Sequence, residues 1–190
     1  MENEKYSNYP LSISAILGLI EANDIAIPEI QRPFVWRRTQ VRDLIDSLYK
    51  GYPTGYIILW KNPNVKLKDG TISSGKKVLI DGQQRITAMM TAIAGRTVFN
   101  SEYKEDRITI AFNPLAAKSN DPDAEIFAVT TPAIRKSKWW IPDIAELFST
   151  SYSSFKFIPK YCEANPEMEP EELERIITKV KGIANRMIGV

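Results

Sequence analysis

The stretch that decides the fold runs from residue 77 to residue 87 and reads Lys77-Val78-Leu79-Ile80-Asp81-Gly82-Gln83-Gln84-Arg85-Ile86-Thr87. Its first four residues are of the kind that forms a strand. After the glycine, apolar residues recur at helical spacing, which predicts a helix from about Gln84 to Ala94. These apolar residues are Ile86, Met89, Met90 and Ile93. The stretch therefore predicts a strand–turn–helix unit with a polar turn.

The polar turn itself allows two interpretations. A strand that enters a helix through a glycine leaves backbone N–H groups free, and these groups attract anions such as phosphate. Gly82 permits close approach of a ligand, Arg85 can clamp phosphate oxygens, and Asp81 can hold a metal ion or orient a water. Gln83 and Gln84 can orient a nucleophilic water or contact a ribose or base, and Thr87 can add a hydroxyl. The same spacing equally fits a plain helix cap, with Asp81 as the capping residue.

Upstream of the turn, the sequence predicts two helices and two strands. Apolar spacing favours helices over residues 11–23 and 40–50, the second capped by Thr39 and ended by Gly51. A short strand is expected at residues 25–27 and a buried strand at residues 56–60. Residues 61–76 are rich in Asn, Lys, Gly and Ser and predict an exposed loop.

Downstream of the turn, strands are expected at residues 108–112 and 126–129, and the pattern then becomes helical. Helices are predicted around residues 143–148, 155–163 and from Pro170 onward. The expected fold class is therefore α/β, or α+β: residues 1–130 form a small mixed sheet with helices, and residues 131–190 form a helical extension. The apolar ending, Arg186 to Val190, suggests a piece truncated from a longer chain.

A second polar and aromatic segment precedes the 40–50 helix. Arg32 stands before Pro33 and is held extended, while Trp36 can stack on a base or a guanidinium. The alternative is a packed loop whose aromatic side chains belong to the core. Three basic side chains follow closely: Arg37, Arg38 and Arg42. They fit either a patch that faces phosphates or an ordinary solvated helix face.

Composition excludes several classes of chemistry. The 190 residues carry a net charge of +2, no histidine and one cysteine, Cys162. The absence of histidine excludes Ser-His-Asp triads, HNH nuclease centres and histidine-containing zinc sites. A single cysteine allows no internal disulfide, and no apolar run reaches the roughly 18 residues of a membrane span. The polar N-terminus, without an apolar signal region, predicts a cytoplasmic protein.

Four motifs in one order carry a resemblance to a known family. They are Gln31-Arg32-Pro33-Phe34-Val35-Trp36, Leu44-Ile45-Asp46-Ser47-Leu48, Gly51-Tyr52-Pro53-Thr54-Gly55 and Ile80-Asp81-Gly82-Gln83-Gln84-Arg85-Ile86-Thr87. Together they resemble the N-terminal domain of GmrSD-type restriction endonucleases, a family related to the ParB and sulfiredoxin fold. The resemblance is strongest over residues 11–95.

The resemblance implies a function and a set of site residues. It implies NTP binding and hydrolysis by a regulatory domain of a DNA-restriction or anti-phage protein. The Asp81 carboxylate adds the expectation that the NTP binds with Mg²⁺. The implied catalytic turn is Asp81, Gln83, Gln84 and Arg85, with Asp81 as the candidate metal ligand. The implied nucleotide-binding residues are Gln31, Arg32, Trp36, Gly82 and Thr87. Arg37, Arg38 and Arg42 are the candidate DNA contacts.

The implied partners extend beyond this chain. Family members often carry a separate C-terminal HNH nuclease domain, so DNA would be engaged through the full-length protein, and no membrane is involved. Two alternatives stay open. One is a non-catalytic nucleic-acid-binding module whose turn grips a DNA phosphate, and the other is a scaffold that passes signals to a missing nuclease. The preferred base, the DNA feature sensed and the oligomeric state are not encoded in any recognisable motif.

Overall fold

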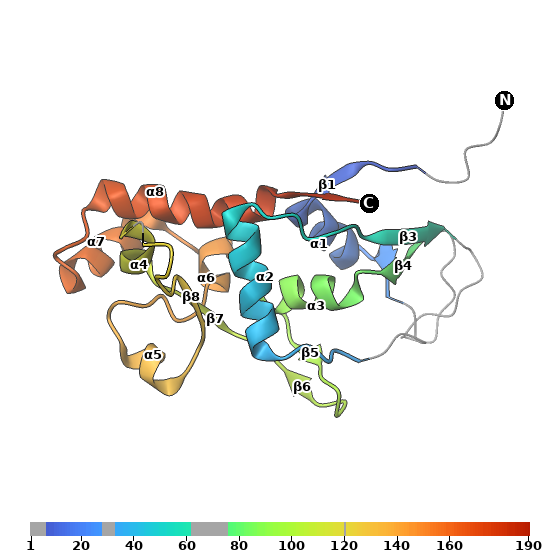
Figure 1. The fold of residues 1–190 in the computed structure, drawn as a ribbon, viewed down its shortest axis with the longest axis horizontal. Coiled ribbons are helices and arrows are strands. Elements are labelled where there is room, and N and C mark those ends of the chain that lie inside the picture. Colours follow the sequence, from blue (N-terminus) through green and yellow to red (C-terminus); the bar gives the residue numbers. More distant parts are fainter. Residues whose placement is uncertain (1–6, 28–32, 62–75, 120) are drawn as a thin grey trace.

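The computed structural model describes residues 7–27, 33–61, 76–119 and 121–190. It has a mixed α/β architecture, with helices packed around small sheets, so the predicted fold class is confirmed (Figure 1). The relation to ParB and sulfiredoxin stays a prediction. No helix in the described ranges is long and apolar enough to cross a bilayer.

The central sheet is small and mixed, as expected. Its strand order is β2 (Ile25–Ala26), β4 (Lys77–Asp81), β3 (Ile58–Lys61). The middle strand, β4, runs parallel to β2 and antiparallel to β3. The pairing with β3 shifts register between Ile58 and Leu59, close to the end of β4 where the polar turn begins.

Strand β3 corrects the expectation of a buried strand at residues 56–60. It begins two residues later than predicted, and Ile58 and Trp60 are exposed. Ile58 and Trp60 stand two residues apart and therefore point to the same face of the sheet, which is left open to solvent at this strand. Only Ile57, just before the strand, is fully packed in the core. The predicted loop at 61–76 lies almost wholly outside the described residues.

Two helices flank the turn. Helix α3 (Gln83–Ala92) follows β4 and packs against α2 (Arg38–Lys50) through their apolar faces. The N-cap of α2 is Arg37 rather than the predicted Thr39, and the Gln40 side chain accepts a hydrogen bond from the Arg37 N–H at 2.9 Å. Gly51 ends α2 as predicted, in a left-handed conformation with φ of 80°.

The two ends of the described chain meet in a strand pair that the sequence does not predict. Strand β1 (Pro10–Ser12) pairs antiparallel with β9 (Met187–Gly189). Helix α1 (Ile13–Glu21) begins directly after β1, and the Ser12 hydroxyl caps it by accepting a hydrogen bond from Ala15 N–H. Strand β9 also reaches the central region, because Ile57 N–H donates to the Gly189 carbonyl at 2.9 Å.

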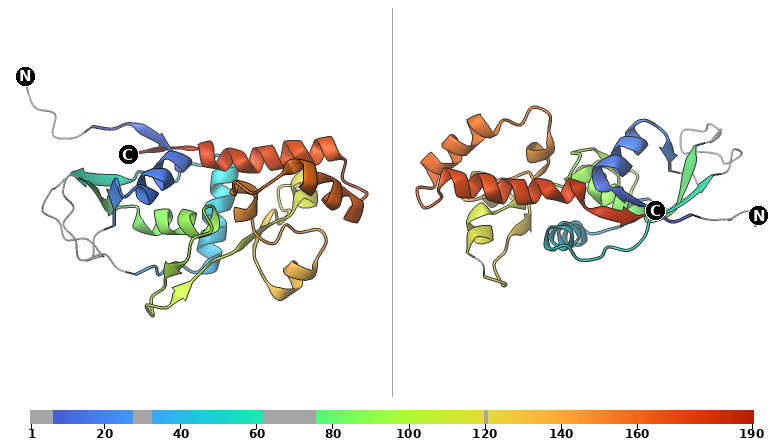
Figure 2. Two further views of the ribbon diagram at one scale, coloured as in Figure 1. Left: turned by 180° about the vertical axis from the view of Figure 1, so that it is seen from behind. Right: turned by 90° about the horizontal axis from the view of Figure 1, so that it is seen from above.

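The remaining elements form a hairpin, a second strand pair and a set of helices. The hairpin is β5 (Val98–Phe99) with β6 (Glu105–Asp106), and the second pair is β7 (Ile110–Phe112) with β8 (Phe127–Val129). Helices follow in the order α4 (Pro114–Lys118), α5 (Pro132–Lys136), α6 (Ala145–Phe148), α7 (Ser154–Ala164), α8 (Pro170–Lys181) and the 3-10 helix η1 (Gly182–Asn185). Figure 2 shows that α8 runs along the molecule and leads into β9.

One apolar core includes residues from both of the predicted parts. Ile45, Leu79 and Ile86 belong to the same buried cluster as Leu173 and Val180. Burial of such side chains stabilises the fold by roughly 1.5–3 kcal/mol each. The 1–130 and 131–190 parts are therefore packed on shared apolar surface, while their division into two units stays a prediction.

Candidate functional site

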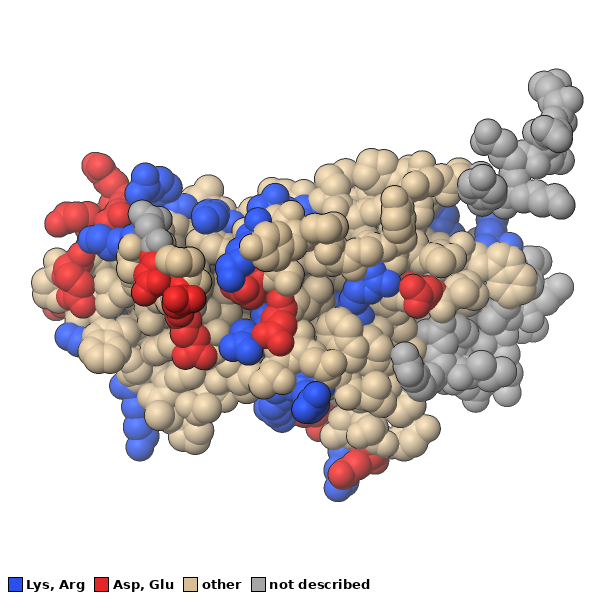
Figure 3. Space-filling model, viewed as in Figure 1, with Lys and Arg blue, Asp and Glu red and all other residues tan. Residues whose placement is uncertain are grey.

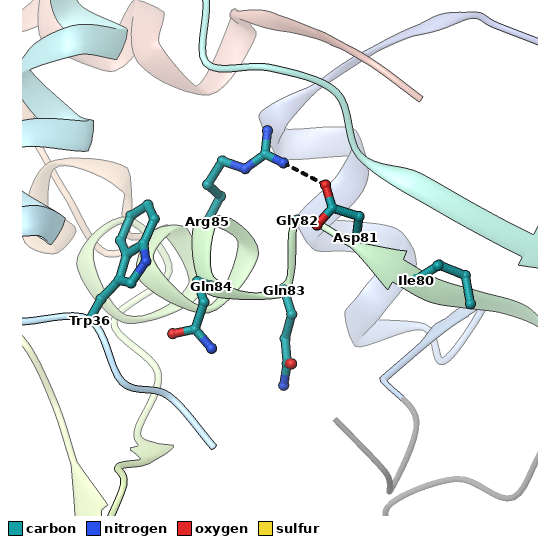
Figure 4. A pocket seen from close by; sticks show the side chains of 7 residues that line it. All are labelled: Trp36, Ile80, Asp81, Gly82, Gln83, Gln84 and Arg85. Carbon is teal, nitrogen blue, oxygen red and sulfur yellow. Dashed lines mark hydrogen bonds and ion pairs between the residues drawn. The ribbon is translucent and has the colours of Figure 1, made fainter. Parts of the chain in front are cut away.

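The polar turn between β4 and α3 opens into a hollow of about 330 Å³. The residues that line it come from the end of β4, the first turn of α3 and the segment before α2 (Figure 4). They are Trp36, Ile80, Asp81, Gly82, Gln83, Gln84 and Arg85. Six of these seven residues are consecutive in the chain, and Trp36 approaches them from the facing segment.

Gly82 gives the turn its shape. It is the N-cap of α3 and has a left-handed backbone with φ of 93°, which favours glycine over any other residue. A Cβ at this position would collide with Ile57 Cδ1, so the close packing of the turn on Ile57 also requires glycine. Within the described residues no side chain caps α3, so its first N–H groups remain available at the hollow.

Asp81 corrects the plain-cap interpretation of this turn. It is the last residue of β4, one position before the N-cap, and it makes no capping hydrogen bond to α3. Its side chain is 66% exposed, and its Oδ2 lies 3.2 Å from Arg85 Nη2. The interpretation of Asp81 as the helix cap is therefore wrong, and its exposed carboxylate lines the hollow while paired with Arg85.

Arg85 is positioned by two contacts and one close approach. Its Nη1 donates to the Thr54 carbonyl at 2.6 Å, and its Nη2 donates to Asp81. A Cβ on Gly55 would lie 2.7 Å from Nη1, so the absence of a side chain at residue 55 makes room for the guanidinium. The Arg85 side chain is only 20% exposed, which keeps its charge at the rim beside the start of α3.

Gln84 has a different environment from its neighbour Gln83. The Gln84 side chain is buried, its Oε1 accepts from Val35 N–H at 2.9 Å, and its Nε2 donates to the Pro33 carbonyl at 3.1 Å. It thus fixes the segment that carries Trp36 against α3. Gln83 makes no hydrogen bond with its side chain in the described part of the chain and is the amide that remains open to a ligand.

The other predicted nucleotide-binding residues are placed as follows. Trp36 is half-buried and lines the hollow, while its contact with a nucleotide stays a prediction. Thr87 does not line this hollow but lines a neighbouring one on the same helix. Gln31 and Arg32 lie outside the described residues.

The three arginines predicted to contact DNA are only partly free. Arg38 donates twice to the Asp106 carboxylate, with both distances 2.9 Å. Arg42 lies 2.6 Å from Asp43 and 3.8 Å from Glu125, whereas Arg37 is exposed. Figure 3 accordingly shows basic and acidic atoms interspersed across this face rather than a uniform basic patch. The DNA contact stays a prediction, with two of its three charges already paired.

Among the residues that line the hollow, Asp81 is the one with a carboxylate that could coordinate a metal ion. Among the described residues, no three acidic or cysteine side chains come together as a metal site. Mg²⁺ is usually held by one or two carboxylates together with substrate phosphates. Asp81 therefore fits as a ligand of a Mg²⁺ that arrives with a nucleotide, and not of an ion bound by the protein alone.

Sequence reasoning missed two supports of the site. Thr54 and Gly55 fix Arg85, and the only signal for them was the Gly-Tyr-Pro-Thr-Gly motif quoted above. Arg186 donates from Nε to the Leu48 carbonyl at 3.1 Å and from Nη2 to the Tyr49 carbonyl at 3.4 Å, at the C-terminal end of α2. Nothing in the sequence around Arg186 indicates this contact.

Comparison with known proteins identifies the family. The model of the GmrSD restriction endonuclease N-terminal domain matches residues 13–185, which is most of the chain. The chain belongs to this family. The match extends well beyond residues 11–95, where the motifs are concentrated, and includes α8 and η1 of this GmrSD N-terminal domain.

One curated relative is an uncharacterized protein, MJ0686, from Methanocaldococcus jannaschii. It is 29% identical over an alignment that covers 37% of this chain and 14% of the relative. The chain therefore spans about one seventh of the length of the curated relative that it matches.

Proposed function

We propose that this GmrSD N-terminal domain binds and hydrolyses a nucleoside triphosphate and regulates a DNA-restriction or anti-phage protein. The observation that supports this proposal most directly is the uncapped start of α3, which opens with Arg85 into one hollow. Unpaired N–H groups and a guanidinium together match the charge and the acceptor geometry of phosphate. The family assignment supports the restriction context.

The proposed reaction is transfer of the terminal phosphoryl group to water. A new bond forms between the water oxygen and the terminal phosphorus, and the bond to the bridging oxygen breaks. The N–H groups of α3 and Arg85 stabilise the charge that develops on the phosphate oxygens. Asp81 accepts the proton of the water or holds it in line, and Mg²⁺, when bound, neutralises phosphate charge.

A second candidate function uses the same turn without chemistry. A DNA phosphate could be gripped by the α3 N–H groups and Arg85, with positioning but no sequence readout. That function requires neither the Asp81 carboxylate nor a bound triphosphate. The paired states of Arg38 and Arg42 favour the nucleotide proposal over it, because they leave less charge for a nucleic-acid backbone.

The first test is nucleotide binding by the domain, with and without Mg²⁺, in wild type and in Arg85→Ala. Loss of a hydrogen bond to a charged group should weaken binding by about 1.5–3 kcal/mol. Arg175→Ala is the matched control, because Arg175 is an exposed arginine on α8 that pairs only with Glu172 among the described residues. If Arg85→Ala and wild type bound nucleotide with equal affinity, Arg85 would not be a nucleotide-binding residue.

The second test separates hydrolysis from DNA grip through Asp81→Asn. The change keeps the size of the side chain but removes its charge, so nucleotide should still bind while phosphate release falls, by roughly 10²-fold or more. Asp43→Asn is the control, since Asp43 is a similarly exposed carboxylate beside an arginine. Unchanged phosphate release in Asp81→Asn would exclude Asp81 from catalysis, whereas absence of phosphate release in wild type would favour the non-catalytic function.

A further inference from the structure

A second hollow, of about 440 Å³, lies beside the first and shares Gln83 with it. One wall is a single face of α3, where Gln83, Thr87 and Met90 follow one another at helical spacing. The opposite wall is formed by Phe34 and by the β5–β6 hairpin with Phe99 and Tyr103. The lining is predominantly apolar and aromatic, with a few polar groups, as is typical of sites for small organic ligands.

The Thr87 hydroxyl adds a polar group to this hollow. Thr87 lines the hollow and is 8% exposed, and its hydroxyl makes no hydrogen bond within the described ranges but is not fully buried. A hydroxyl on the wall of a hollow can donate a hydrogen bond to a ligand and accept one from it. Gln83 adds a second open polar group at the boundary between the two hollows.

The aromatic wall is exposed although it is held in place. Phe99 is 60% exposed and Tyr103 is 75% exposed. The Asn100 side chain fixes the hairpin tip by accepting hydrogen bonds from the Glu102 and Lys104 N–H groups, at 2.9 and 3.1 Å. The Arg38–Asp106 pair joins the base of the hairpin to α2. These contacts hold the backbone of the hairpin, and its exposed rings offer planar surfaces on which a flat ligand can stack.

We propose that this second hollow holds the base of the nucleotide whose phosphates occupy the first. This inference rests on the proposed function and adds the place of the nucleoside to it. A nucleobase has apolar faces and a polar edge, which match the aromatic wall and the Gln83 and Thr87 groups. Figure 4 shows the Gln83 side chain pointing away from Asp81 and Arg85. A nucleotide that crosses α3 at Gln83 therefore reaches both hollows at once.

The test compares the four common NTPs with tripolyphosphate, which carries the same phosphates without a base. Wild type should bind at least one NTP about tenfold or more tightly than tripolyphosphate. The double variant Phe99→Ala/Tyr103→Ala should weaken binding of that NTP by about 5- to 150-fold, as expected for loss of base stacking, and leave tripolyphosphate unchanged. Phe155→Ala, which removes a fully exposed ring on α7, is the control and should change neither affinity.

A conservative variant tests the hydroxyl separately. Thr87→Val keeps the shape of the side chain, so the fold should persist while NTP affinity falls by about 2- to 12-fold. Equal binding of NTP and tripolyphosphate by wild type would overturn the base site but leave the phosphate site intact. NTP affinity that is unaffected by the double variant would also overturn it. Binding of neither ligand would instead refute the proposed function, and the base site with it.

Discussion

Replacement of Gln84 by alanine tests whether this residue positions the site or reacts within it. The change removes two hydrogen bonds, from Val35 N–H at 2.9 Å and to the Pro33 carbonyl at 3.1 Å. At about 0.5–1.5 kcal/mol for each, the free energy of unfolding should fall by about 1–3 kcal/mol. For a domain of this size that lowers Tm by roughly 2–12 °C. The segment carrying Trp36 should loosen, and nucleotide affinity should fall with it.

Gln83→Ala is a control of the same residue type at the adjacent position. Its amide makes no hydrogen bond among the described residues, so the free energy of unfolding should change by less than about 0.5 kcal/mol. Both variants can be measured by urea unfolding, nucleotide titration and phosphate release. If Gln84→Ala were as stable as Gln83→Ala but hydrolysed nucleotide more slowly, Gln84 would be a catalytic group and the positioning role would be wrong.

Three further changes test the supports and the surface. Arg186→Ala removes a cation and two hydrogen bonds from the C-terminal end of α2 and should lower the free energy of unfolding by about 1–2 kcal/mol in urea; no loss would mean that water replaces them. Neutralising Arg37, Arg38 and Arg42 together should reduce the magnitude of the slope of log affinity for DNA against log salt concentration by about one unit, because Arg38 and Arg42 already have carboxylate partners. A reduction of three units would show that these two ion pairs open when DNA binds. Burial raises the pKa of Cys162, so at pH 7.5 iodoacetamide should alkylate the folded chain more slowly than the chain in urea; equal rates would refute the packed position.

The local elements were predictable because their signals lie within a few residues. Gly51 ends α2 in the left-handed conformation that favours glycine, and Pro170 stands at the first turn of α8. The strand–turn–helix unit followed from one glycine between two apolar patterns of different period. In each case the residue type alone restricts the backbone, so no distant contact is needed to decide the structure.

What could not be predicted depends on partners far away in the chain. Gln84 and Gln83 are identical in type, and only the position of residues 33–35, about fifty places away, separates their roles. The pairing of Arg38 with Asp106 likewise joins residues that no spacing rule connects. Residues 56–60 looked buried because they are apolar, but Ile58 and Trp60 lie on a face of the sheet that is left open to solvent.

The same long-range contacts explain why the chain's last residues belong to the support of the site. Arg85 is held by the Thr54 carbonyl, and the segment around Thr54 lies between the end of α2 and β3. Arg186 contacts the last carbonyls of α2, and the Gly189 carbonyl accepts from Ile57 N–H on the other side of that segment. The segment that orients Arg85 is thus fixed at one end by Arg186, which directly follows η1, and at the other by Gly189 of β9. A perturbation of the C-terminal strand should therefore reach the hollow at the start of α3 through residues 51–57, although no residue of β9 lines it.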